Sequence, residues 1–130
     1  MADRRAISSD GAPAAVGAYS QAIVAGELVF TAGQLGLDPQ TGEFSAPDVG
    51  GQAERALANL AAILETAGSG LDRLVKVTVF LADIADWPAF NEVYGRILPQ
   101  PYPARSAFAV KDLPRGARVE IEAVATVGVG

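Results

Sequence analysis

Two stretches in which apolar and polar positions alternate, residues 74–81 and 118–127, most constrain what this chain can fold into. A repeat of two residues is typical of a β-strand that buries one face. In the second stretch the apolar face runs from Val119 through Ile121 to Val127, with Glu120 and Glu122 on the other face. In the first stretch the expected buried face consists of Val75, Val77, Val79 and Leu81. Both stretches predict strands of a sheet whose second face is only partly apolar.

Two helices are predicted around the first of these strands. Asp48 is a plausible N-cap, and an apolar stripe at helical spacing follows it until Gly68 ends the helix. The second helix follows Asp86, with Pro88 tolerated in its first turn. Its apolar side comprises Trp87, Phe90, Tyr94 and Ile97, and Asn91 lies on that same side. Each helix therefore has one face suited to packing on a sheet.

The remaining segments complete a ββαβαββ order. Residues 22–31 read as a strand pair around Gly26, residues 33–47 as an exposed loop with room for a short extended piece, and residues 105–110 as a strand. We expect one domain spanning residues 1–130, of the α+β class, with a mixed sheet covered on one face by two helices. Self-association is the simplest way to cover the other face. If 105–110 and 118–127 pair as an antiparallel hairpin, Arg105 lies within a rung or two of Glu120 and Glu122.

Composition excludes several classes of function. The chain has no cysteine and no histidine, which removes disulfides, Cys/His zinc sites, thiol nucleophiles and imidazole bases. No clustered aspartates suggest a magnesium site, so we expect no metal. A net charge of −5 makes nucleic acid an unlikely partner. The sequence contains no apolar run of membrane-spanning length, so no membrane partner is expected and a cytoplasmic location is the default.

Arg105 is the most informative single residue. It carries the only formal charge between Arg96 and Lys111, and it begins an apolar strand. A guanidinium is always charged and presents a planar fork of donors, so it requires an anion. From the residues alone, that anion is either Glu120 or Glu122, or a carboxylate of a ligand. The two glutamates could instead pair with Arg118 or with a lysine of a neighbouring subunit. Asn91 could simply bond to its own helix or to water, and Tyr19 could be a partly buried aromatic near the first strand.

Several motifs together resemble the Rid family (also called YjgF/YER057c/UK114) of enamine and imine deaminases. The resemblance runs over residues 12–127. It is carried by Gly-Ala-Tyr-Ser-Gln-Ala at 17–22, Thr-Ala-Gly-Gln at 31–34, Lys-Val-Thr-Val-Phe-Leu at 76–81, Phe-Asn-Glu-Val-Tyr at 90–94, Pro-Ala-Arg-Ser at 103–106 and Val-Glu-Ile-Glu-Ala at 119–123. The resemblance implies a chorismate-mutase-like fold, a cytoplasmic homotrimer, clefts at the subunit interfaces, and a role in metabolite damage control without a cofactor.

The resemblance also implies roles for matching positions. Arg105 corresponds to the residue that grips the substrate carboxylate and Glu120 to the residue that handles the attacking water. Tyr19 and Asn91 correspond to residues lining the cleft, and Gly33 and Ala107 to positions that contribute backbone groups. The chain departs from the family pattern at three positions. Ala18 replaces a usual proline. Ala32 stands where many members have serine, and Ala107 stands where some members have cysteine.

The leading hypothesis is hydrolysis of 2-imino acids of the 2-aminoacrylate type to 2-keto acids and ammonia. Such imines hydrolyse unaided in water, so orientation and proton transfer are sufficient help. A second hypothesis keeps the cleft but makes it a non-catalytic sensor or carrier of small carboxylates. A third, a ribonuclease or translation inhibitor, is disfavoured by the acidic charge and the absence of histidine.

Overall fold

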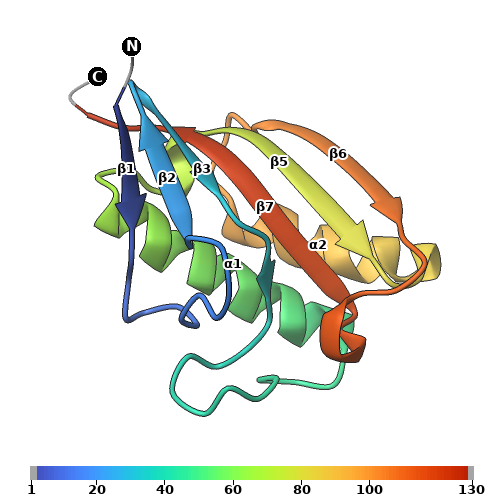
Figure 1. Ribbon diagram of the computed structural model, residues 1–130. Coiled ribbons are helices and arrows are strands. Elements are labelled where there is room, and N and C mark those ends of the chain that lie inside the picture. Colours follow the sequence, from blue (N-terminus) through green and yellow to red (C-terminus); the bar gives the residue numbers. More distant parts are fainter. Residues whose placement is uncertain (1–2, 129–130) are drawn as a thin grey trace.

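In the computed structural model, which describes residues 3–128, a seven-stranded sheet carries both α-helices on one face (Figure 1). The strands are β1 (Arg4–Ile7), β2 (Ala22–Ala25), β3 (Leu28–Thr31), β4 (Gln34–Leu35), β5 (Leu74–Leu81), β6 (Ala104–Ala109) and β7 (Val119–Thr126). The helices are α1 (Val49–Thr66) and α2 (Trp87–Ile97). The sheet order is β1-β2-β3-β7-β5-β6, and β4 pairs with β7. Among the strand pairs of residues 3–128, β5 and β6 are parallel and the others are antiparallel, so the predicted α+β class with a mixed sheet is confirmed.

Two short strands add to the predicted ββαβαββ order. β1 pairs with β2 at one edge of the sheet, and its burial is confined to Ile7, since the other three residues are exposed. β4 is two residues long and lies in the loop of residues 33–47, where the sequence left room for a short extended piece. β1 is too short to show a clear repeat of two residues, so the sequence pattern did not reveal it.

The expected hairpin between residues 105–110 and 118–127 is wrong. β6 pairs only with β5, in parallel, and β5 separates it from β7. The reason is the helical connection between β5 and β6. A strand that returns through a crossover helix enters the sheet parallel to its predecessor, and the next strand is then left to pair on the other side of β5.

This strand order places Arg105 and the glutamates on opposite faces of the sheet. Arg105 is in register with Val77, which is buried on the helix side. Glu120 is in register with Phe80, which points away from the helices, and Glu122 is in register with Thr78 on that same open face. The predicted proximity of Arg105 to these glutamates within one chain is therefore also wrong.

The expected burial of Val75 is a further error, because β5 contains a bulge. The register shifts between Leu74 and Lys76, so that Leu74 packs against the core and Val75 is left 46% exposed. From Val77 onward the predicted alternation holds, with Val77, Val79 and Leu81 buried. A bulge of this kind inserts one extra residue into the strand, so the side chains that precede it point to the opposite faces of the sheet from those that the alternation predicts.

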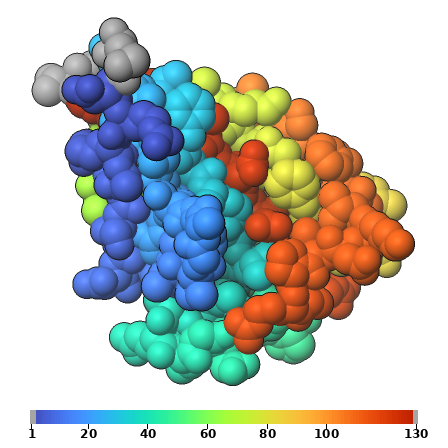
Figure 2. All heavy atoms as spheres, in the orientation of Figure 1, coloured from blue at the N-terminus to red at the C-terminus, as the bar shows by residue number. Residues whose placement is uncertain are grey.

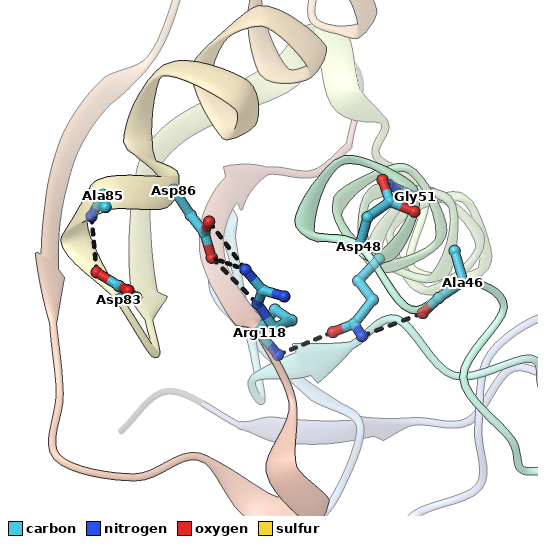
Figure 3. Close-up of polar contacts among 8 residues, drawn as sticks. Ala46, Asp48, Gly51, Asp83, Ala85, Asp86 and Arg118 are labelled. Atoms are coloured by element: carbon cyan, nitrogen blue, oxygen red, sulfur yellow. Dashed lines mark hydrogen bonds and ion pairs between the residues drawn. The ribbon is translucent and has the colours of Figure 1, made fainter.

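Helix α1 begins and ends where the sequence predicts. The Asp48 side chain accepts a hydrogen bond from the N–H of Gly51 at 3.0 Å (Figure 3). At the other end Gly68 has a φ of 84°, which favours glycine, and the chain turns away from the helix. Between these ends the side chains of Leu57, Leu60 and Leu64 are buried against the sheet.

The start of α2 is tied to the start of β7 by an ion pair. Arg118 Nη2 lies 2.7 Å from Asp86 Oδ2 and 2.9 Å from Oδ1, and Arg118 Nε donates to Oδ2 at 3.1 Å (Figure 3). Arg118 therefore pairs with Asp86, and not with Glu120 or Glu122. This contact fixes the helix that carries Asn91 relative to the strand that carries Glu120.

We expect Asp86→Asn to lower the free energy of unfolding by about 1 kcal/mol. The bidentate ion pair between Arg118 and the mostly buried Asp86 carboxylate should stabilise the fold more than an ion pair between two exposed side chains does. Urea denaturation would measure the change in the free energy of unfolding. The matched control is Glu54→Gln, which removes the ion pair to Arg96 whose two side chains are 51% and 54% exposed. Equal effects of the two substitutions would contradict the expectation.

The face opposite the helices is open and partly apolar. Phe30 and Phe108 are 44% and 45% exposed there, and Phe108 packs edge-on against Phe80 at 5.4 Å. In Figure 2 side chains of β3 (cyan), β7 (red) and β5 (yellow) reach the surface with no helix over them. Among residues 3–128, no helix is both long and apolar enough to cross a membrane.

Candidate active site

Arg105 is held in a cradle of α2 side chains. Its Nη1 donates to Asn91 Oδ1 at 2.9 Å, and its Cζ lies 4.6 Å from the ring centroid of Trp87 and 4.7 Å from that of Tyr94. Trp87, Asn91 and Tyr94 follow one another at spacings of four and three residues, which places them in a row on one side of the helix. The guanidinium of Arg105 thus lies over the rings of Trp87 and Tyr94 and donates a hydrogen bond to Asn91, which stands between them.

No carboxylate neutralises this guanidinium within residues 3–128, where Arg105 takes part in none of the ion pairs. The Tyr94 ring beside the guanidinium belongs to a neutral phenol: burial raises its pKa further above the usual value, and the charge of Arg105 opposes this only in part. Two uncharged rings and an amide hold the guanidinium in place. Its full positive charge and its remaining N–H donors are left for an anion. Asn91, Tyr94, Tyr102 and Arg105 line a cavity of about 350 Å³, which we call the Arg105 hollow.

The free edge of β6 adds backbone donors beside Arg105. The N–H of Val110 donates to Leu81 O at 2.9 Å and therefore points toward β5. Since N–H groups alternate between the two edges of a strand, those of Arg105 and Ala107 point away from β5. β6 ends the sheet order, so within residues 3–128 no further strand pairs with this edge. The position of Ala107 suits the backbone role that the sequence resemblance implies.

Glu120 lies on the open face of β7, directly against Gly33. A Cβ at Gly33 would collide with the Glu120 carboxylate, so only glycine leaves room for this side chain as it stands. Gly33 joins β3 to β4, and β4 pairs with β7 at Leu35 and Glu120. The link from β3 to β4 thus places Gly33 beside the Glu120 carboxylate.

Tyr19 lies on the same hollow as Glu120. It is 54% exposed on the segment between β1 and β2, whereas the sequence left open that it is partly buried. Gln21 fixes this segment, since its side chain bonds to Ser9 and donates to the carbonyl of Pro13 at 2.7 Å. A cavity of about 430 Å³, the Glu120 hollow, is lined among others by Pro13, Tyr19, Ala32, Gly33, Pro114 and Glu120.

Burial raises the pKa of the Glu120 carboxyl above its usual range, and the negative charge of Glu122, two residues along the same face, raises it further. A base with such a pKa loses its proton only at higher pH than an ordinary glutamate. A carboxyl whose pKa lies closer to neutral pH is suited both to accept and to return a proton, because general acid–base transfer is most efficient when the pKa approaches the working pH.

We expect Glu122→Gln to move the acid limb of the pH profile of kcat/KM to lower pH. The substitution removes the repulsion, so the pKa of Glu120 falls and the base is ionised at more acidic pH. Rates measured across the pH range would check this direction. A shift to higher pH, or none, would show that Glu122 does not act on Glu120.

The structure thus gathers the six sequence candidates into two groups. Arg105, Asn91 and Ala107 lie around α2 and the edge of β6, and Tyr19, Gly33 and Glu120 lie around the open face of β7. The sequence missed Trp87 and Tyr94 as site residues, because their helical spacing was assigned to the core. The signal was present, since a polar Asn91 lies between them on the same apolar side.

A family model described as endoribonuclease L-PSP matches residues 9–127. The chain therefore belongs to the endoribonuclease L-PSP family, the YjgF/UK114 or Rid family indicated by its motifs.

Named relatives are similar over nearly the whole chain. It is 52% identical over 118 residues to the RutC family protein y4sK of Sinorhizobium fredii, covering 91% of this chain and 94% of that protein. It is 46% identical over 125 residues to 2-iminobutanoate/2-iminopropanoate deaminase of Capra hircus, covering 96% and 91%. The crystal structure of RidA from the Antarctic bacterium Psychrobacter sp. PAMC 21119 superposes with a TM-score of 0.91 at 46% identity, covering 95% of this chain and 99% of that one.

Proposed function

We propose that this protein hydrolyses 2-imino acids, and the enamines that tautomerise to them, to 2-keto acids and ammonia. The observation that carries the proposal is the cradle of Arg105, a fixed guanidinium that no carboxylate neutralises among residues 3–128. It suits a planar small acid, because a guanidinium binds a carboxylate through two parallel hydrogen bonds. The deaminase named among the relatives acts on substrates of this class.

In the proposed reaction Arg105 binds the substrate carboxylate and leaves the C=N carbon exposed. The imine reacts in its protonated form, C=NH2⁺. Glu120 takes a proton from water while the water oxygen bonds to that carbon, and the electron pair of the C=N double bond moves to nitrogen, which gives a carbinolamine with a hydroxyl and an NH2 group. Glu120 then gives its proton to the NH2 group. The carbon–nitrogen bond breaks and the C=O bond of the keto acid forms as the hydroxyl proton returns to Glu120, from which it is released to the departing ammonia as ammonium. One water is consumed, and no electron is transferred.

Arg105 and Glu120 of one chain lie on opposite faces of the sheet, so the proposed cleft requires two copies. One copy contributes its Arg105 hollow and the next contributes its Glu120 hollow. A homotrimer of single-domain chains, each copy related to the next by rotation, would form three such clefts. The open apolar face supports association of this kind, because Phe30 and Phe108 would be covered.

The activity is tested by forming 2-iminopropanoate in place with a PLP-dependent serine dehydratase and following release of pyruvate and ammonia. We expect the protein to accelerate both. Calorimetry that detected keto-acid binding without acceleration would instead favour a carrier or sensor of small carboxylates.

The shared cleft is tested by mixing Arg105→Ala and Glu120→Gln subunits, unfolding them and refolding them together. Each pure variant lacks one half of every cleft, but about a quarter of the clefts in random mixtures receive both intact halves. Activity should return in the mixture. If the mixture stays as inactive as its components, Arg105 and Glu120 do not act across an interface.

We place this protein in the cytoplasm, where it would remove reactive metabolites. RNA cleavage is not expected of it, although the matching family is described as endoribonuclease L-PSP. The chain has 15 acidic against 10 basic residues, a balance that disfavours a phosphate backbone. RNA cleavage by the purified protein that disappeared in the Arg105→Ala variant would contradict this view.

A further inference from the structure

A second hollow adjoins the Arg105 cradle. It measures about 480 Å³ and is lined by Ile84, Ala85, Trp87, Pro88 and Ala107, and we call it the Trp87 hollow. All five side chains are apolar. The Arg105 hollow, by contrast, presents the amide of Asn91 and the hydroxyl of Tyr102, which donates to Gly95 O at 3.0 Å. The two hollows therefore offer different chemistry.

Arg105 separates the two hollows. Trp87 and Tyr94 stand two helical turns apart on α2, and the guanidinium lies within 5 Å of both ring centroids, at 4.6 Å and 4.7 Å. Tyr94 lines the Arg105 hollow and Trp87 lines the other one. On the strand, Arg105 and Ala107 lie on one side of β6, about 7 Å apart along its axis. The Trp87 hollow thus begins where the guanidinium ends, between the first turn of α2 and Ala107.

A carboxylate on Arg105 sets the direction of the rest of a bound acid. The N–H groups at the free edge of β6 run from Arg105 toward Ala107, which leads away from Tyr102 and toward the Trp87 hollow. A ligand that uses both Arg105 and the Ala107 N–H therefore brings its substituent beside Trp87, Pro88 and Ile84. Ile84 is 57% exposed and has no polar neighbour in the lining, so an apolar substituent would cover it.

We propose that the Trp87 hollow binds the apolar substituent of the imino acid, and that the protein prefers 2-imino acids with isobutyl or benzyl side chains to 2-iminopropanoate. This inference rests on the proposed function. Ala107 is then a specificity-determining residue, because its small side chain keeps the hollow open. A methyl substituent leaves most of the hollow empty and gains little from it.

The test compares three imines, each made in place by a D-amino-acid oxidase from D-alanine, D-leucine or D-phenylalanine. Wild-type protein should show kcat/KM values for the two large imines about tenfold above the value for 2-iminopropanoate. Ala107→Leu fills the hollow without removing the backbone N–H, and should lower kcat/KM for the large imines about tenfold more than for the small one. The matched control is Ala109→Leu, which adds the same side chain two residues further along β6, outside the hollow, and should change all three values alike.

Ile84→Asp provides a second route in case Ala107→Leu does not fold. It places a charge at an exposed position of the lining and should weaken selection for the large imines while 2-iminopropanoate hydrolysis continues. Equal wild-type values for all three imines, or equal losses for all three in both variants, would overturn this inference alone. Absence of acceleration with every imine, 2-iminopropanoate included, would overturn the proposed function with it.

Discussion

Replacing Arg105 with alanine is expected to lower kcat/KM for 2-iminopropanoate by about 100-fold or more. The substitution removes the charge-assisted, two-point contact that we propose Arg105 makes to the substrate carboxylate. It leaves no buried charge behind, since the partners of the guanidinium are two rings and the Asn91 amide. The fold should persist, so the loss is to be measured by steady-state kinetics together with a thermal unfolding curve that matches wild type.

Lysine at the same position is the informative control. It keeps the positive charge but cannot form the planar fork or lie flat between Trp87 and Tyr94, so Arg105→Lys should recover only a small part of the lost activity. Asn91→Ala should cost less than either, because it removes one hydrogen bond that orients the guanidinium and leaves both rings. Full activity in Arg105→Ala would show that the substrate carboxylate binds elsewhere.

Local chemistry made much of this fold predictable. α1 has an N-cap at Asp48 and a glycine after its end, and its apolar stripe is continuous between them. β7 alternates without interruption from Val119 to Thr126. Each of these signals depends on residues a few positions apart, which is the range over which sequence patterns are informative. The helices and long strands were therefore predictable, and the bulge at Val75 was not, since it depends on pairing with β7.

The arrangement of the candidate site was not predictable to the same extent. Arg105 and Glu120 were both recognisable, but their placement on opposite faces depends on β5 lying between β6 and β7. That order follows from the crossover through α2 and has no signature near either residue. Likewise, Gly33 was expected at the start of an exposed loop, and only the pairing of β4 with β7 reveals that the Glu120 carboxylate lies against it.

Glu120→Gln is expected to lower kcat by about 100-fold to 10,000-fold, the range that general acid–base catalysis contributes. The amide has nearly the shape of the carboxylate and fits against Gly33, but it cannot accept a proton from water or return one to nitrogen. In the proposed reaction the substrate carboxylate binds at Arg105, so ligand binding should change little. Steady-state kinetics and calorimetric titration with 2-oxobutanoate would measure the two effects separately.

The matched control for Glu120→Gln is Glu122→Gln, which makes the same chemical change two residues away on the same face of β7. If proximity of a negative charge to the substrate were all that mattered, the two variants would lose activity to a similar degree. If Glu120 transfers the proton, only its own replacement abolishes turnover, while Glu122→Gln retains turnover and shifts the acid limb to lower pH. Equal losses of turnover and of ligand binding in Glu120→Gln would instead assign this carboxylate to binding, and the water would need another base.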